Sequence, residues 1–205
     1  MSEDYEFTQD WFTHHSENWR QLLAKNPPSR ILEIGSYEGR ATCFIIDRCA
    51  ADREIEVHCV DTWQGGVEHN PSQMGDVERR FDSNLAKARA RAAHNVDLHK
   101  HRALSSEALV QLLADGRRES FDLIYVDGSH QAPDVLADAV LAFMLAKVGG
   151  IIAFDDYLWS KDRPGEQDFY QLPKPAVDAF VNIYQRKLRV MQAPLYQLYV
   201  RKVAS

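Results

Sequence analysis

Five short apolar runs recur along this chain, and helix-like segments separate them. The runs are RILEIG, EIEVHCVD, VDLHKH, FDLIYVDG and GGIIAFDD. Helical patterns lie between them, near residues 39–50, 74–93, 105–115 and 131–146. A continuous apolar run is typical of a strand covered on both faces, as in a parallel sheet with crossover helices. The alternation therefore predicts an α/β fold, a Rossmann-like three-layer sandwich around a mostly parallel sheet.

The two ends of the chain depart from this alternation. The segment KLRVMQAPLYQLYVRK holds two β-rich runs broken at Ala193 and Pro194, which favours a hairpin. Such a hairpin would place an antiparallel strand on the otherwise parallel sheet. Near the N-terminus, the spacing of Trp11, Trp19 and Leu22 predicts a helix over about residues 8–25, which NPPSR then stops.

Composition narrows the class of protein. The 205 residues are 45% hydrophobic and 26% charged, which is typical of a soluble globular protein. A formal net charge of -6 argues against general affinity for nucleic acid or an anionic membrane. No apolar run approaches the roughly 20 residues that span a bilayer, and the acidic N-terminus is not a secretory signal. We therefore expect a cytoplasmic protein, and the oligomeric state stays open.

The three cysteines agree with that location. Cys43, Cys49 and Cys59 show no CxxC spacing, and three thiols cannot all pair. They are expected to be buried apolar side chains in a reducing compartment.

The segment ILEIGSYEGRAT predicts a ligand-binding turn after the first strand. Gly35 follows the apolar run and Gly39 opens the next helix, so the backbone can approach a negatively charged ligand group at a helix N-terminus. Tyr37 stands where a dinucleotide-binding fingerprint has the glycine that makes room for pyrophosphate. A ligand with a carboxylate and a nucleoside is therefore favoured. Asp61 ends the second strand, where it can accept hydrogen bonds from ribose hydroxyls. Packing alone would explain the glycine turn equally well.

Carboxylates also end the fourth and fifth runs. Asp127 closes FDLIYVD, and Asp155 and Asp156 close GGIIAFDD. Ligands bind outside the carboxyl ends of parallel strands, so the three side chains are expected in one crevice. Asp155 and Asp156 would point to opposite faces of a regular strand. Both reach one site only if the chain turns off the sheet there.

Three converging carboxylates need a positive partner, because their mutual repulsion would otherwise raise their pKa values. A divalent cation is one such partner, and all-oxygen ligands select Mg²⁺, Ca²⁺ or Mn²⁺. Lys161 and Arg163 are the alternative, in a structural salt-bridge cluster. His130 follows Asp127 by three residues and is suited to act as a general base at neutral pH. It could equally be a metal ligand or support one.

ILEIGSYEG, VDGSH and IIAFDDY, together with the terminal hairpin, resemble the class I S-adenosylmethionine (SAM)-dependent methyltransferases. The resemblance covers nearly the whole chain and is strongest to the metal-dependent O-methyltransferases, both the catechol and the macrolide-sugar types. It implies a seven-stranded sheet with an antiparallel last strand. It also implies SAM and a divalent cation, Mg²⁺ first, as cofactors. The methyl acceptor would be a small polyhydroxy molecule, such as a sugar, a phenol or a natural product.

The resemblance also implies roles for individual residues. Asp127, Asp155 and Asp156 match the three metal-ligand positions, and His130 and Asp127 would be catalytic. Ser105 is also a good helix N-cap residue, a second explanation that is compatible with the first. Residues implied at the SAM site are Glu33, Gly35, Ser36, Tyr37, Gly39, Asp61, Thr62, Trp63, Ser105, Ser106 and Asp127.

The sequence departs from the catechol enzymes at three positions. The third metal ligand is Asp156 rather than asparagine, His130 stands in place of a lysine base, and Ser129 replaces an aromatic residue over the adenine. Trp63 is a candidate to cover the adenine from another side. These departures leave the metal-site interpretation intact but do not support a catechol as substrate.

The expected organisation is a single methyltransferase domain over residues 1–205. Within it, residues 1–28 would form a helical cap and residues 157–175 a substrate lid, since a long loop after the acidic pair is typical of a functional segment. Two other functions remain as alternatives. One is an NAD-type oxidoreductase, against which the GxxxG loop and the hairpin argue, and the other is a non-catalytic SAM-binding protein.

Overall fold

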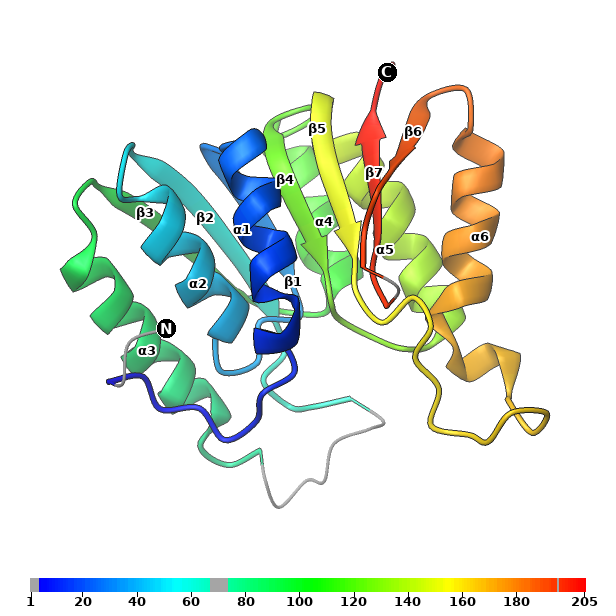
Figure 1. Ribbon diagram of the computed structural model, residues 1–205, viewed down its shortest axis with the longest axis horizontal. Coiled ribbons are helices and arrows are strands. Elements are labelled where there is room, and N and C mark those ends of the chain that lie inside the picture. The colour runs from blue at the N-terminus through cyan, green and yellow to red at the C-terminus, as the bar shows by residue number, and fades with distance from the viewer. Residues whose placement is uncertain (1–3, 67–73, 195) are drawn as a thin grey trace.

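Seven strands form one sheet in a computed structural model, which describes residues 4–66, 74–194 and 196–205 (Figure 1). The strand order is β3-β2-β1-β4-β5-β7-β6. Neighbouring strands run parallel from β3 to β5, and β7 pairs antiparallel with both β5 and β6. The strands are β1 (Arg30–Ile34), β2 (Ile55–Asp61), β3 (Val96–Arg102), β4 (Phe121–Val126), β5 (Ala146–Phe154), β6 (Leu188–Met191) and β7 (Leu198–Lys202).

Helices cover both faces of this sheet. In Figure 1 α1, α2 and α3 lie in front of the strands, and α4 and α5 lie behind them. The α-helices are α1 (Ser16–Lys25), α2 (Arg40–Cys49), α3 (Val77–Arg91), α4 (Ser105–Ala114), α5 (Ala132–Leu145) and α6 (Pro173–Tyr184). Two short 3₁₀ helices are η1 (Thr13–His15) and η3 (Phe169–Gln171). The seven-stranded three-layer sandwich with one antiparallel strand is confirmed.

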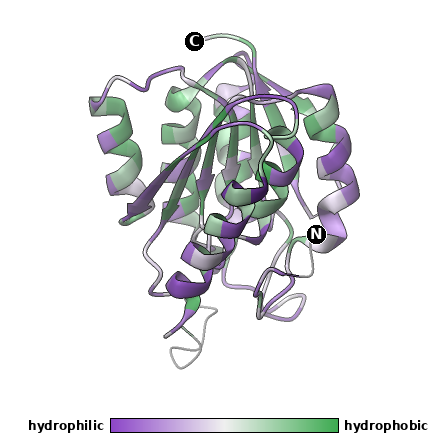
Figure 2. Cartoon of the chain, turned by 90° about the vertical axis from the view of Figure 1, so that its left-hand side faces the viewer, coloured by the Kyte–Doolittle hydropathy of each residue, from purple (hydrophilic) through white to green (hydrophobic). Residues whose placement is uncertain are grey.

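Each face of the sheet has its own hydrophobic core. One core joins the sheet to α1, α2 and α3, and Trp19 is its largest fully buried side chain. The other joins it to α4, α5 and α6, with Phe180 of α6 fully buried. The helices accordingly carry both hydrophobic and hydrophilic stretches along their length (Figure 2). All three cysteines are buried and free, as the sequence predicts.

Helix α6 is the main element that the sequence pattern did not predict. Its first residues fall in the segment expected to be a loop, which also contains η3. Pro173 and Pro175 made the sequence of this segment resemble that of a loop. Both prolines lie in the first turn of α6, where a backbone N–H has no intrahelical partner to lose.

The strand register brings the candidate residues to one edge of the sheet. Ile34 of β1 pairs with Val60 of β2 and with Val126 of β4, and Val126 pairs with Phe154 of β5. The residues just after these, including Asp61, therefore end neighbouring strands at the same level, at the lower edge of the sheet in Figure 1. Within the described ranges, no helix has both the length and the apolar character that crossing a membrane requires.

Candidate active site

The two glycines of the loop after β1 are required by the packing of the protein itself. Gly35 has φ +85°, and a Cβ on it would lie 1.9 Å from the carbonyl oxygen of Asp127. Gly39 has φ +80°, and a Cβ on it would lie 2.4 Å from Leu85 of α3. The positive φ angles favour glycine in any case. The packing explanation is therefore correct, and it leaves room for the ligand-binding one.

Asp61 organises the backbone of this loop. Its Oδ2 accepts a hydrogen bond from the N–H of Tyr37 at 2.8 Å, and its Oδ1 accepts one from the N–H of Trp63 at 2.6 Å. Each carboxylate oxygen keeps a second lone pair, so ribose hydroxyls can still donate to it. The structure thus brings Asp61 and the glycine loop together, as the sequence indicates.

Trp63 and Thr62 lie beside that contact. The Trp63 ring is buried against Phe81, with centroids 4.8 Å apart, and its Nε1 donates to the carbonyl oxygen of Tyr37 at 2.9 Å. Thr62 Oγ1 accepts from the N–H of Gln64 at 3.2 Å. These contacts give Trp63 a role in shaping the loop. Cover of the adenine by Trp63 and contact of Thr62 with the cofactor stay predictions.

Glu33 points into the core beneath the loop. Its side chain is 1% exposed and accepts a hydrogen bond from the hydroxyl of Thr42. Burial raises the pKa of Glu33 to about 7, and the charge of Asp61 adds to the rise. A buried carboxyl group beneath the loop, with a pKa of about 7, is suited to shape the loop, and contact of Glu33 with the cofactor stays a prediction.

Glu38 is a site residue that the sequence analysis missed. It is 1% exposed and forms an ion pair with Arg80 of α3, with Nε and Oε1 2.5 Å apart. It also accepts hydrogen bonds from the N–H and the hydroxyl of Thr8, at 2.6 and 2.8 Å. Glu38 therefore ties the N-terminal segment to the glycine loop. A single glutamate in a loop is usually exposed, so the sequence contained little sign of this role. The only sign was its place between Tyr37 and Gly39.

Asp127, Asp155 and Asp156 end neighbouring strands, as predicted. The N–H of Asp127 donates to the carbonyl oxygen of Ile34 at 2.8 Å, so the residue lies directly beside the glycine loop. Strand β5 ends at Phe154, and Asp156 has φ +53°. The chain turns off the sheet at that point, which is the condition for the adjacent aspartates to serve one site.

Uncharged side chains hold Asp155 in place. It accepts hydrogen bonds from the hydroxyl of Tyr125 and, at 3.0 Å, from Nε2 of Gln197. His15 Nε2 also lies 3.9 Å from Asp155 Oδ1, and burial lowers the pKa of His15 to about 4, which keeps it neutral at pH 7. Tyr125 and Gln197 had no sequence signal, because both look like ordinary strand residues. For His15 the sequence allowed two roles, covering the substrate pocket or packing the N-terminal helix on the sheet.

Burial and mutual repulsion raise the pKa values of two of these aspartates, which a nearby positive charge would offset. Burial, followed by the charges of Asp155 and Asp156, raises the pKa of Asp127 well above its usual range. Burial and the charge of Asp156 raise the pKa of Asp155 to about 6. Among the described residues, no lysine or arginine forms an ion pair with any of the three, and that includes Lys161 and Arg163. The described ion pairs therefore lend no support to the salt-bridge alternative, which stays open for this arrangement.

The carboxylates of Asp127, Asp155 and Asp156 are suitable ligands for a hard cation, but their oxygens do not surround a single point in this structure. Six carboxylate oxygens suit Mg²⁺, Ca²⁺ or Mn²⁺. Over the described part of the chain, however, only Glu56, His58 and His99 bring three ligand atoms within 4.8 Å of one another. Binding of a cation by the aspartates would require their side chains to turn inward, and the metal role stays a prediction.

His130 faces the aspartates across a small pocket. Its Nε2 lies 2.9 Å from Oδ2 of Asp156, and its ring stacks on Trp159 with centroids 4.1 Å apart. His130 is 9% exposed, so these two contacts fix its ring. The pocket is lined by Val126, Asp127, Gly128, Ser129, His130, Val135, Phe154, Asp155, Asp156 and Pro173.

The two serines open α4, after β3. Ser105 is the first residue of the helix, and Leu104 occupies the N-cap position. The interpretation of Ser105 as an N-cap residue is therefore wrong by one position. Its hydroxyl lies beside Asp138 of α5 and opposes the effect of burial, which raises the pKa of Asp138 to about 7. Contact of Ser105 and Ser106 with the adenine, and of Ser36 with the methionine part of SAM, stays a prediction.

The fold of this chain is similar to that of solved O-methyltransferases. Two solved structures share the fold: the O-methyltransferase TomG from Streptomyces achromogenes, in complex with SAM, and an O-methyltransferase from Bacillus cereus, in complex with SAH. TomG is 20% identical, with a TM-score of 0.62, over 92% of this chain and 79% of its own. The Bacillus cereus enzyme is 18% identical, with a TM-score of 0.63, over 96% of this chain and 84% of its own.

Sequence comparison gives the family. The uncharacterized protein y4gI of Sinorhizobium fredii is 33% identical over 112 residues, which are 54% of this chain but only 11% of that relative. The model of the methyltransferase domain family matches residues 32–157, from β1 to just past the paired aspartates. This match covers more than half of the chain and includes the glycine loop, Asp61, Asp127 and His130, so the chain belongs to the methyltransferase domain family.

Proposed function

We propose that this protein transfers a methyl group from SAM to a hydroxyl oxygen of a small polyhydroxy molecule, with the help of a divalent cation. One observation carries the proposal: Asp127, Asp155, Asp156 and His130 line one pocket directly beside the glycine loop. A methyl donor on the loop and an acceptor in the pocket would then be neighbours.

The glycine loop and Asp61 form the expected SAM site. TomG and the Bacillus cereus enzyme, which share this fold, are solved with SAM and SAH. The loop opens a helix N-terminus at Arg40, which favours the carboxylate of the methionine part. Asp61 keeps lone pairs for the ribose. Tyr37 stands in place of the glycine that a pyrophosphate needs, which argues against the NAD-type alternative.

The three aspartates would hold the cation. When bound, it would lower the pKa of an acceptor hydroxyl and stabilise the resulting oxyanion. Its charge would also relieve the repulsion that raises the pKa of Asp127 and of Asp155. An acceptor with two neighbouring hydroxyls suits such a site, because both oxygens can then be held in place.

The chain's own residues orient the reaction. The acceptor oxygen attacks the methyl carbon, the carbon–sulfur bond breaks, and SAH leaves as a neutral thioether. The hydroxyl proton passes to His130, whose ring Trp159 and Asp156 hold toward the pocket. Alignment of the reacting atoms supplies roughly 7–11 kcal/mol of the barrier reduction. General-base help adds about 10²–10⁴-fold.

Two segments complete the proposed site. Residues 157–175 would act as the substrate lid: Trp159 already touches His130, and the hydroxyl of Tyr170 lies 3.4 Å from Gln131 Oε1 beside the pocket. Residues 1–28 would act as the cap, of which residues 1–3 lie outside the described part. Within it, the exposed ring of Trp11 contacts Tyr37 of the glycine loop, with centroids 5.0 Å apart.

A methyl-transfer assay tests the proposal. The full chain is incubated with SAM labelled in its methyl group and with a panel of catechols, sugars and other polyhydroxy compounds, with Mg²⁺ or with EDTA. We expect label on a hydroxyl oxygen of at least one acceptor, with one SAH formed per methyl group, and loss of transfer in EDTA. Tight SAM binding without transfer to any acceptor would favour the non-catalytic alternative. Tight NADH binding without SAM binding would favour the oxidoreductase.

A further inference from the structure

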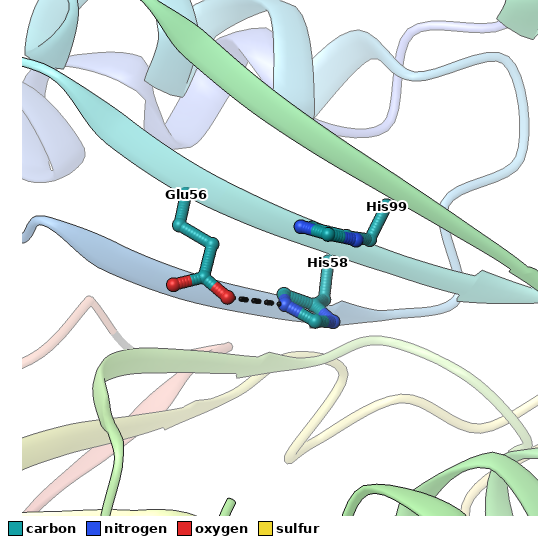
Figure 3. A group of neighbouring side chains, drawn as sticks. All are labelled: Glu56, His58 and His99. Carbon is teal, nitrogen blue, oxygen red and sulfur yellow. Dashed lines mark hydrogen bonds and ion pairs between the residues drawn. The ribbon is translucent and has the colours of Figure 1, made fainter.

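A second group of metal-binding side chains lies on β2 and β3, the two strands at one end of the sheet. Glu56 and His58 lie on β2 and His99 lies on β3, and each offers a ligand atom within 4.8 Å of the other two. Figure 3 shows the carboxylate of Glu56 facing the ring of His58, with the ring of His99 above it. The register pairs His58 with His99 and Glu56 with Asp97, so the strands themselves hold the group together.

We propose that Glu56, His58 and His99 bind a divalent transition-metal ion of the zinc class. Two imidazoles and one carboxylate are a common protein ligand set for Zn²⁺ and leave one position of a tetrahedral ion for water. This set differs in kind from the three aspartates, whose oxygens select harder ions. The two sites would therefore take different metals.

His58 has an outer hydrogen-bond partner, as metal-binding histidines usually do, and His99 has a carboxylate nearby. His58 Nδ1 lies 2.8 Å from Nε2 of His101, while His58 Nε2 lies 2.9 Å from Oε1 of Glu56. Oδ2 of Asp97 lies 3.1 Å from Nε2 of His99. When the ion binds, the proton of neutral His58 sits on Nδ1 and is donated to His101, so Nε2 is left for the metal. His58 stays neutral, and no proton is released from it.

Two arginines lie beside Glu56, so the imidazoles of His58 and His99 would contribute most to binding of the ion. Arg117 lies 2.6 Å from its Oε1, and Arg30 lies 3.1 Å from its Oε2. These guanidinium groups offset the carboxylate charge, which makes the site unsuitable for Mg²⁺ or Ca²⁺. Those ions need several anionic or carbonyl oxygens, whereas Zn²⁺ binds neutral imidazole well.

The site lies next to the surface of the protein. The His58 side chain is only 3% exposed, but that of His99 is 37% exposed, on the edge strand β3. His58 precedes Asp61 by three residues on the same strand, so a bound ion would brace the strand that organises the glycine loop.

Metal titration tests this inference without any activity measurement. The chelator-stripped full chain is titrated with Zn²⁺ by calorimetry in excess Mg²⁺, and with Co²⁺ by absorption spectroscopy, which reports low-coordinate nitrogen ligation. We expect one Zn²⁺ per chain, and binding at least tenfold weaker in His99→Gln and in His58→Gln. His101→Gln should weaken binding about 10–100-fold through the loss of the outer partner.

Two controls separate this site from others. His94→Gln changes an exposed histidine just before β3, and the double variant Asp155→Ala and Asp156→Ala removes the acidic pair. Both should bind Zn²⁺ like the wild type. Because His99 is half-exposed, its variant is expected to fold even if the His58 variant does not. Unchanged Zn²⁺ affinity in folded His99→Gln, loss of binding in the aspartate variant, or no uptake by the wild type would each overturn the proposal.

Discussion

The carboxylate of Asp61, at the end of β2, accepts the backbone N–H of Tyr37 in the glycine loop at 2.8 Å. A second hydrogen bond, from the N–H of Trp63 at 2.6 Å, fixes its other oxygen. The second strand thereby holds the loop that follows the first, and the proposed SAM site depends on this link. Because the two residues are 24 positions apart, only the parallel pairing of β1 with β2 brings them together.

Asp61→Asn should weaken SAH binding about 10–100-fold. The amide keeps one acceptor oxygen but turns an NH₂ group toward the second backbone N–H, so one hydrogen bond to a charged group is lost. Such a bond contributes about 1.5–3 kcal/mol. Calorimetric titration with SAH measures the change. Asp52→Asn, an exposed substitution in the turn between α2 and β2, serves as the control and should bind like the wild type. Equal affinity in both variants would show that Asp61 does not support the cofactor site.

Gly35→Ala should destabilise the protein far more than Gly116→Ala. Both glycines have positive φ, +85° and +79°, so both substitutions carry a backbone cost of about 1–2 kcal/mol. Only at Gly35 would the new Cβ meet another group, the Asp127 carbonyl oxygen at 1.9 Å, whereas nothing lies within 4 Å at Gly116. Urea unfolding compares the two. Similar losses of stability would mean that the contact between the loop and Asp127 is looser than described.

Glu33→Gln should change how stability depends on pH. The pKa of Glu33 is raised from 4.5 to about 7, so between these values the folded protein binds more protons than the unfolded chain. The free energy of unfolding therefore falls as pH rises through this window, by up to about 1.4 kcal/mol per pH unit, and levels off above pH 7. The variant lacks this contribution. Its stability relative to the wild type should thus rise from pH 5 to pH 8.

Urea unfolding at several pH values in that range measures the difference. Glu107→Gln, at an exposed position in the first turn of α4, is the matched control and should follow the wild type throughout. If the difference between Glu33→Gln and the wild type did not vary with pH, Glu33 would have an ordinary pKa in the folded protein.

His130→Asn should lower kcat/KM about 10²–10⁴-fold for an acceptor found in the transfer assay, because it removes the proposed base. SAH affinity should stay close to that of the wild type, since Asp156 and Trp159, which His130 contacts, belong to the proposed acceptor pocket and lid rather than to the glycine loop. His94→Gln is the control for the loss of an exposed imidazole. A variant with near wild-type kcat/KM would assign the proton to another group.

Much of the fold was predictable because its signals are local. Each buried strand leaves a continuous apolar run, and the break at Ala193 and Pro194 marks the hairpin. Gly35 and Asp61 were identified for a similar reason, since a turn glycine and a strand-end acid occupy fixed places in a parallel sheet. Helix α6 was missed because the prolines in its first turn look like a loop in the sequence.

The remaining site residues depend on contacts between distant segments. Glu38 forms its ion pair with Arg80, which is 42 residues away in the sequence. Gln197, in the loop just before β7, donates a hydrogen bond to Asp155, also 42 residues away. His99 lies on the edge strand β3, and its place beside His58 follows only from the register of β2 and β3. Periodicity reveals which face a side chain takes but not which partner it meets.

Divalent-ion binding tests the central claim most directly. Mn²⁺ is titrated by electron paramagnetic resonance into the wild type and into the double variant Asp155→Ala and Asp156→Ala, with Zn²⁺ excluded. SAH affinity of each is measured in parallel as evidence of folding. We predict that the wild type binds Mn²⁺ and that Mg²⁺ competes, while the double variant loses this binding and keeps its SAH affinity. Equal Mn²⁺ binding by both proteins, with SAH affinity intact, would contradict the account.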